Sequence, residues 1–336
     1  MSEIRTGILS FGMSGQIFHA PFLDLHHGFE LSAVVERTKK QAATKYPSIR
    51  SYDSVDEILA DDTIELIVVN TPNATHFDFA LRAIQAKKHV LVEKPFATTS
   101  LEAKQLYEEA KKNDVQVFPY HNRRYDSDFQ SVKQVLNYGK LGELVEAHIR
   151  FDRYKYGIGE KKAKEIPGPG AGLLYDLGPH ILDQSLSIFG KPAHWEKRVG
   201  HFRPQTQVDD FATILLSYPS GLQVFVSTSL LVADPQPAFI LHGTLGSYTK
   251  HRTDVQEKQL SEGMKPDDKD YGVELIENQG ILTTVDKKGV KTQERVPAEP
   301  STYMNLFEDV YQSIKFGKMY PVKQEEIIEQ LEILES

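Results

Sequence analysis

The sequence predicts an α/β protein in which an N-terminal doubly wound parallel sheet is followed by a C-terminal α+β domain with an open, largely antiparallel sheet. Two observations predict this arrangement. Short apolar runs alternate with helical segments over the first third of the chain, and beyond Tyr120 the strands become longer and alternate apolar with polar side chains. A chain of 336 residues is long for one core, so we divide it into residues 1–121 and 122–336.

Five apolar runs in the first domain have the character of buried parallel strands, because they are short, rich in β-branched residues and bounded by polar turns. They cover residues 8–9, 31–35, 66–69, 90–92 and 115–118. Helical segments at 76–86 and 100–112 lie between such runs, and apolar residues recur in the second at roughly helical spacing. This alternation implies the parallel sheet of a Rossmann domain.

The second domain carries antiparallel signals. Residues 145, 147, 149 and 151 are apolar, whereas the residues between them are polar. Two further strand patterns, 211–218 and 222–230, flank Pro219-Ser220-Gly221, which predicts a hairpin. Residues 254–272 hold many charges and Pro266, so we expect an exposed loop there.

Composition excludes several classes of function. The chain has no cysteine, which rules out disulfides and thiolate nucleophiles, and its formal net charge of -8 disfavours nucleic acid as a partner. No apolar stretch approaches the roughly 20 residues that cross a bilayer, and no signal peptide is recognisable, so we expect a cytoplasmic protein without a membrane partner. His19, His26 and His27 lack a clear ligand arrangement, and we assign no metal.

A glycine motif follows the first apolar run. The segment Ser10-Phe11-Gly12-Met13-Ser14-Gly15 matches the second and third glycines of the dinucleotide fingerprint, with Ser10 at the first position. Gly12 would let the backbone approach a pyrophosphate, and Gly15 would let the following helix pack closely on the strand. We therefore expect the segment, Met13 and Ser14 included, to bind a nicotinamide dinucleotide.

The residues after the second strand leave the choice between NAD and NADP open. Glu36 stands 21 residues after Gly15, where an acidic side chain accepts hydrogen bonds from the adenosine ribose and favours NAD. Arg37 follows directly and can pair with a 2′-phosphate or stack on the adenine, and Lys39 and Lys40 add positive charge. Pairing with a 2′-phosphate would favour NADP.

Four separated segments resemble one known family. "NTPNATH" at 70–76, "HVLVEKPFATT" at 89–99, "YHNRRYDSDF" at 120–129 and "GLLYDLGPHILDQ" at 172–184 are similar to the Gfo/Idh/MocA oxidoreductases, closest to the scyllo-inositol dehydrogenase-like branch. The resemblance implies a Rossmann domain followed by a substrate-binding sheet domain. It places the family's catalytic lysine on Lys94 and its aspartate and histidine on Asp176 and His180. Its cofactor loop falls on Thr71, Pro72, Asn73 and His76.

These residue types suit oxidation of an alcohol. An imidazole titrates near neutral pH, so His180 can act as the base, and Lys94 can stabilise the developing alkoxide. Asp176, four residues before His180, can bind substrate or orient the imidazole if both lie on one helix. Pro179 allows an alternative in which the helix begins at Pro179 and Asp176 lies in the preceding turn.

The remaining candidates flank these residues. We place Glu93, Lys94 and Asn122 with the cofactor. We place Lys94 also with the substrate, together with Arg123, Tyr154, Asp176 and His180. Arg123 is equally suited to pairing with nearby aspartates, and Tyr154 to an interface between subunits.

The function expected from these residues is hydride transfer between NAD or NADP and a secondary hydroxyl or ketone of a sugar, inositol or related polyol. Two alternatives remain open: reduction of an imine or tetrapyrrole, and a regulatory protein that binds the cofactor without catalysis. We also expect a homodimer or homotetramer through sheet packing, on either the Phe225/Ser227/Ser229 row or the Val224/Val226 row.

Overall fold

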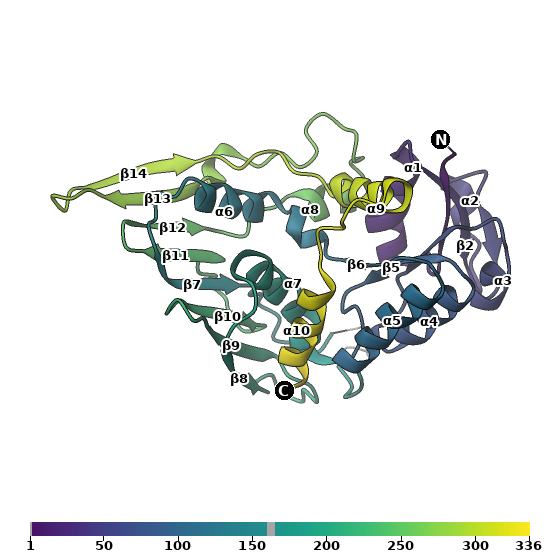
Figure 1. Cartoon of the computed structure of the whole chain (residues 1–336), viewed down its shortest axis with the longest axis horizontal. Coiled ribbons are helices and arrows are strands. Elements are labelled where there is room, and N and C mark those ends of the chain that lie inside the picture. The colour runs from purple at the N-terminus through teal and green to yellow at the C-terminus, as the bar shows by residue number, and fades with distance from the viewer. Residues whose placement is uncertain (1, 160–164) are drawn as a thin grey trace. The chain divides into compact units, whose positions relative to one another are not determined.

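The computed structural model describes residues 2–159 and 165–336, which form two compact units (Figure 1). The N-terminal unit runs to Asn122 and also contains Gln256–Tyr271 and Thr302–Leu331. The C-terminal unit contains Arg123–Val255, Gly272–Ser301 and Glu332–Ser336. The sequence analysis assigned everything after residue 121 to one continuous domain, whereas two later segments belong to the N-terminal unit.

The sheet of the N-terminal unit has six strands in the order β3-β2-β1-β4-β5-β6. Their bounds are β1 Ile4–Ile8, β2 Phe29–Val35, β3 Arg50–Tyr52, β4 Leu66–Val69, β5 His89–Glu93 and β6 Val117–Tyr120. All neighbouring strands are parallel, which confirms the doubly wound Rossmann prediction. The order reverses between β1 and β4, and ligands of such sheets bind at the carboxyl ends of the strands around that point.

The helices of this unit alternate with its strands along the chain or come from its two later segments. They are η1 Gly15–His19, α1 Ala20–Leu25, α2 Ala42–Lys45, α3 Val55–Leu59, η2 Asn73–Thr75, α4 His76–Gln85, α5 Ser100–Lys112, α8 Gln256–Ser261 and α9 Met304–Phe316. The helix predicted at 100–112 is confirmed, and a capping box formed by Thr99 and Glu102 fixes its start. Helix α10 Gln324–Glu335 continues into the last residues of the C-terminal unit.

The prediction of an exposed loop at 254–272 holds for residues 262–270, which are non-helical and mostly exposed, but it was wrong for the ends of the segment. Gln256 and Leu260 are buried in α8, and Tyr271 packs its ring 6.3 Å from that of Phe22. Phe22 also stacks on Phe307 of α9 at 5.3 Å. Most charged residues of the segment are exposed, whereas the ring contact with Phe22 holds Tyr271 against α1. Gln256 accepts a hydrogen bond from the N–H of Tyr303, just before α9, at 2.8 Å.

The sheet of the C-terminal unit has eight strands in the order β14-β13-β12-β11-β7-β10-β9-β8. Their bounds are β7 Leu144–Arg150, β8 His194–Gly200, β9 Phe211–Ser217, β10 Gln223–Ser229, β11 Phe239–Gly243, β12 Gly246–Lys250, β13 Gly280–Val285 and β14 Lys291–Val296. Only β7 and β10 pair in parallel among these, so the largely antiparallel prediction is confirmed. Strands β9 and β10 form the predicted hairpin.

One face of this sheet is covered by helix. Helix α7 Gly172–Phe189 packs on β7, β9 and β10 (Figure 1). Val224 and Val226 of β10 are buried on the covered face, whereas Phe225 and Ser227 on the other face are half-exposed. Helix α6 Ser127–Asn137 and the short η3 Asn122–Tyr125 precede the sheet, and η5 Ile276–Asn278 leads into β13.

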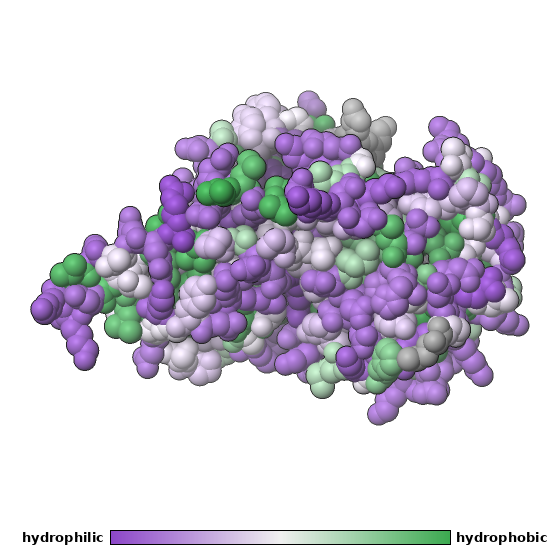
Figure 2. Space-filling model, turned by 90° about the horizontal axis from the view of Figure 1, so that it is seen from above, coloured by the Kyte–Doolittle hydropathy of each residue, from purple (hydrophilic) through white to green (hydrophobic). Residues whose placement is uncertain are grey.

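The surface is mostly hydrophilic on the face seen in Figure 2, where hydrophobic residues form separate small groups. Within the described part of the chain, every helix is too short or too polar to cross a lipid bilayer.

Candidate functional site

Close packing at Gly15 shapes the turn after β1. A Cβ at Gly15 would lie 2.2 Å from the carbonyl oxygen of Ser10, so only glycine fits there. The side-chain amide of Asn70, at the end of β4, donates to the same carbonyl at 2.8 Å. These contacts hold the start of the first helix against the ends of β1 and β4.

The tip of this turn is open. Gly12 and Met13 are exposed, and a Cβ at Gly12 would meet only the Oγ of Ser10, at 3.5 Å. The N–H of Gly12 donates to that Oγ at 3.3 Å. A ligand can therefore approach the backbone at Gly12, and Ser10 satisfies the amide in its absence.

Glu93, at the end of β5, binds the helix that follows the glycine turn. Its carboxylate accepts a hydrogen bond from the hydroxyl of Ser14 at 2.7 Å and contacts Nε2 of His19 at 2.9 Å. Burial alone would raise the pKa of Glu93, but these two hydrogen bonds and the charges of His19 and Lys94 lower it to about 2. Glu93 thus joins the segment that carries Lys94 to the glycine turn.

His76 joins two neighbouring loops. Its Nδ1 lies 2.7 Å from the carbonyl of Pro95, and its Nε2 lies 2.8 Å from the carbonyl of Thr71. Burial lowers the pKa of His76, although both carbonyls oppose the change. His76 therefore fixes the loop after β4 relative to the loop after β5, and Asn73 begins the short η2 helix between Thr71 and His76.

A cavity of about 470 Å³ lies at the carboxyl ends of β1, β2 and β4, and we call it the Glu36 cavity. Five predicted cofactor residues line it: Ser10, Glu36, Arg37, Thr71 and Pro72. The sequence analysis did not assign a role to other lining residues, which include Gln16, Thr38, Gln41 and Phe79. The open glycine turn and this cavity fit a dinucleotide.

The carboxylate of Glu36 forms hydrogen bonds with groups of the protein itself. It accepts hydrogen bonds from the backbone N–H groups of Gln41 at 2.7 Å and Ala42 at 3.1 Å, and from the hydroxyl of Ser51 at 2.6 Å. Glu36 is buried, whereas Arg37 and Lys39 are exposed at the same cavity. The hydrogen-bonding capacity of Glu36 is therefore largely used within the protein, whereas Arg37 and Lys39 remain exposed.

Lys94 directly follows β5, half-buried, and a cis peptide bond joins it to Pro95. It lies at the carboxyl end of the strand, the edge where doubly wound sheets bind ligands. Asn122 is buried at the start of η3, shortly after β6.

Asp176, His180 and Asp183 all lie in α7, at spacings of four and three residues that place them on one face. Pro179 lies inside the helix, so the alternative in which the helix begins there was wrong. The first turn is capped by Asp209, whose carboxylate accepts the N–H of Leu174 at 2.6 Å. His180 is buried, with its ring 6.2 Å from that of Phe151.

A second cavity, of about 620 Å³, opens beside the first turns of α7, and we call it the Asp176 cavity. Asp176 lines it together with charged residues that the sequence analysis did not identify: Arg153, Lys155, Glu165, Arg203 and Asp209. Tyr154 is exposed and is not among the described lining residues.

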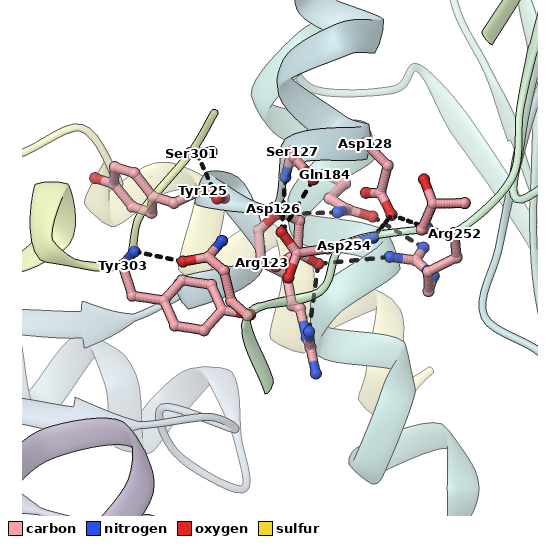
Figure 3. Close-up of polar contacts among 12 residues, drawn as sticks. Arg123, Tyr125, Asp126, Ser127, Asp128, Gln184, Arg252, Asp254, Ser301 and Tyr303 are labelled. Carbon is pink, nitrogen blue, oxygen red and sulfur yellow. Dashed lines mark hydrogen bonds and ion pairs between the residues drawn. The ribbon is translucent and has the colours of Figure 1, made fainter. Parts of the chain in front are cut away.

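Arg123 lies in a buried polar network (Figure 3). Its guanidinium is 3.5 Å from the carboxylate of Asp126, and Arg252 is 3.8 Å from the same group. Burial raises the pKa of Asp126 well above its ordinary range, although both arginines oppose the change. The carbonyl of Arg123 accepts a hydrogen bond from Gln184 of α7 at 3.1 Å. These contacts correspond to the aspartate pairing considered above, and Arg123 is not among the described residues lining the Asp176 cavity.

In the described residues, His26, His27 and Glu308 form the one group with ligand atoms close enough for a metal ion. Nδ1 of His26 accepts the N–H of Gly28 at 3.0 Å, so Nε2 carries the proton and donates to Glu308 at 2.8 Å. This geometry is that of a hydrogen bond.

Comparison with known proteins decides the family. Residues 4–121 match the oxidoreductase family with an NAD-binding Rossmann fold, and residues 129–249 match the GFO/IDH/MocA C-terminal domain. The chain belongs to the Gfo/Idh/MocA oxidoreductase family. This confirms the resemblance found in the sequence.

Several relatives match the chain over nearly its whole length. It is 36% identical to an oxidoreductase of Schizosaccharomyces pombe, over 100% of this chain and 96% of that protein. It is 33% identical to the scyllo-inositol 2-dehydrogenase (NADP(+)) of Bacillus subtilis, over 100% and 93%. The solved structure of the oxidoreductase YvaA of Bacillus subtilis superposes with a TM-score of 0.95 at 32% identity, covering 99% of this chain and 94% of that one.

Proposed function

We propose that this oxidoreductase is an NADP-dependent dehydrogenase that interconverts a secondary hydroxyl and a ketone on a sugar, inositol or related polyol. The observation that carries the proposal is the placement of Asp176 and His180 on one face of α7, with Asp176 lining a cavity of about 620 Å³. A cavity of this size suits a small polyol. The similarity to a scyllo-inositol 2-dehydrogenase supports the same substrate class.

The Glu36 cavity favours NADP over NAD. Glu36 is turned toward Gln41, Ala42 and Ser51, so its charge is compensated by hydrogen bonds within the protein. Arg37 and Lys39 are exposed at the cavity and suit a 2′-phosphate. The relative from Bacillus subtilis is named for NADP(+), which agrees with this choice.

The three catalytic side chains have distinct roles in the proposal. A bound NADP would supply the hydride acceptor, or the donor in the reverse direction, for the substrate carbon. His180 takes the proton of the reacting hydroxyl, and Lys94 stabilises the negative charge that develops on that oxygen. Asp176 accepts hydrogen bonds from the hydroxyl groups of the substrate and thereby orients it.

The test is a spectrophotometric screen of sugars and inositols with NADP⁺ and NAD⁺, which follows formation of the reduced nicotinamide. We expect turnover with at least one polyol, and a higher kcat/KM with NADP⁺. Tight NADP⁺ binding without turnover across the panel would favour the regulatory alternative. Turnover of an imine with the reduced cofactor, without activity on any polyol, would favour the alternative of an imine or tetrapyrrole reductase.

A further inference from the structure

Arg153 and Lys155 line the Asp176 cavity from an extended segment that follows β7. The backbone of this segment is held by hydrogen bonds, since Arg153 N–H donates to the carbonyl of Ser229 at 2.9 Å and Lys155 N–H donates to that of Leu230 at 2.7 Å. Residues two apart in an extended chain point to the same side. Both cationic side chains therefore face the cavity, and Tyr154 between them does not line it.

Two acidic side chains of this cavity, Glu165 and Asp209, form contacts within the protein. Glu165 binds the guanidinium of Arg203 at 2.7 Å, and Asp209 caps α7. In contrast, Arg153 and Lys155 form no ion pair within 4.0 Å with any acidic side chain in residues 2–159 and 165–336. Burial opposes the change, but the hydrogen bond from Arg203 and the nearby ammonium of Lys155 lower the pKa of Glu165. Because no ion pair within 4.0 Å holds Lys155 or Arg153 in the described residues, both cations can contact an anion that enters the cavity.

The ring of Phe151 places Arg153 close to the proposed base. The guanidinium carbon of Arg153 lies 5.1 Å from the ring centroid, and the imidazole of His180 lies 6.2 Å from the same ring. A guanidinium over an aromatic face is attracted to it, which restrains the side chain. An anion bound by Arg153 would consequently lie within a small molecule's length of His180.

We propose that the substrate is a polyol carrying an anionic group, a carboxylate or a phosphate, which Arg153 and Lys155 bind while Asp176 binds its hydroxyl groups. This proposal rests on the proposed function, because it names the substrate class of the same cavity. A guanidinium offers paired N–H donors to an oxyanion, and the ammonium of Lys155 adds a compact positive charge. A neutral polyol has no charged group that would pair with the guanidinium of Arg153 or the ammonium of Lys155.

Calorimetric titration of the full chain with NADP⁺ present tests this without requiring turnover. The probes are D-glucose, D-glucuronate and D-glucose 6-phosphate, with the corresponding galactose set. We expect an anionic sugar to bind about tenfold or more tightly than its neutral counterpart, and Arg153→Ala or Lys155→Ala to reduce that ratio about tenfold. Lys287→Ala, at the exposed turn between β13 and β14, is the matched control and keeps the ratio. The tighter of the two anions identifies the group as carboxylate or phosphate.

Three results would overturn the anion site. The first is equal affinity for neutral and charged sugars. The second is a ratio of anionic to neutral sugar affinity that stays unchanged in both Arg153→Ala and Lys155→Ala. The third is a loss of NADP⁺ affinity in these variants as large as the loss of sugar affinity, which would assign the cations to the cofactor. The failure of the proposed function gives a different result. An anionic sugar that binds through Arg153 and Lys155 but is never oxidised contradicts the dehydrogenase and leaves the anion site standing.

Discussion

Arg124 and Asp183 form a buried bidentate ion pair. Nε of Arg124 donates to the two carboxylate oxygens at 2.8 and 3.1 Å, and Nη2 donates to one of them at 2.7 Å. Asp183 follows His180 by three residues in α7, and Arg124 lies in η3. The pair therefore fixes α7 relative to η3. Asp176, which lines the Asp176 cavity, lies on the same helix.

Replacing one partner of this pair should destabilise the C-terminal unit. Arg124→Ala leaves the carboxylate of Asp183 buried without this partner, and we expect a loss of about 3–5 kcal/mol in the free energy of unfolding. The double variant Arg124→Leu with Asp183→Leu should lose less than the single one, because neither charge remains. Urea unfolding followed by circular dichroism measures both. A double variant less stable than Arg124→Ala would show that the pair is not the source of the loss.

Under the proposed function, Lys94→Ala and His180→Ala should each reduce kcat by about 10²–10⁴-fold, because each would remove a group that acts on the reacting oxygen. NADP⁺ affinity, measured by fluorescence titration, should change little. Lys111→Ala in α5 and His194→Ala in β8 are exposed matched controls and should keep full activity. If either catalytic variant turns substrate over at the wild-type rate, its role is different.

Glu93 should make stability depend on acidity. Its pKa is lowered from 4.5 to about 2, so its contribution is fully present above pH 4.5 and disappears as the pH falls toward 2. Glu93→Gln should therefore be less stable than the wild type near pH 7. As the pH falls from 4.5 to 2, the stability of Glu93→Gln should decrease less than that of the wild type. Urea unfolding across this pH range tests the slope, with exposed Glu143→Gln as the control. Parallel curves for wild type and Glu93→Gln would refute the assignment.

The sequence predicted the fold well where patterns are local. The β-branched runs predicted β4 and β5 almost to the residue, and helical spacing of apolar residues predicted α5 at 100–112. Tertiary contacts decided the rest. The segment around Tyr271 is charged in sequence, yet it is held by a ring contact with Phe22, which is far away in the chain.

The candidate site shows the same limit. The glycine turn and Glu36 were recognisable from their spacing, but whether Glu36 faces a ligand or its own backbone depends on Gln41 and Ser51. Arg153 and Lys155 carry no motif. Their alternation along an extended segment could have suggested a shared side, but the cavity that they line forms only when α7 packs on the sheet.

Arg37→Ser should change cofactor preference. Removing the guanidinium deprives a 2′-phosphate of a charge-assisted hydrogen bond, so we expect NADP⁺ affinity to fall about tenfold while NAD⁺ affinity stays the same. Calorimetric titration with both cofactors gives the ratio. Lys40→Ala is the control, because Lys40 pairs with Asp53 at 2.6 Å and is not among the described residues of the Glu36 cavity. Equal losses for the two cofactors would remove Arg37 from the discrimination, and Glu36→Ser would then be the next variant to compare.

The uncovered face of the C-terminal sheet carries a continuous row of half-exposed side chains. Leu215 pairs with Phe225, Phe225 with His148, and His148 with Ile240, across β9, β10, β7 and β11. The rings of His148 and Phe225 stack at 4.8 Å, so the row is ordered as well as partly apolar. Of the two rows considered from the sequence, Val224/Val226 is buried beneath α7, and Phe225/Ser227/Ser229 lies on this face.

A second copy of the chain that packs on this row would bury it, since a large, partly apolar sheet face suits a symmetric interface. We predict that the wild type is a dimer or tetramer in analytical ultracentrifugation and that Leu215→Glu with Phe225→Glu yields monomers, because facing carboxylates would repel each other across the interface. Val290→Glu, on the exposed turn between β13 and β14, should keep the wild-type mass. A monomeric wild type, or a double variant of unchanged mass, would place any assembly on a different surface.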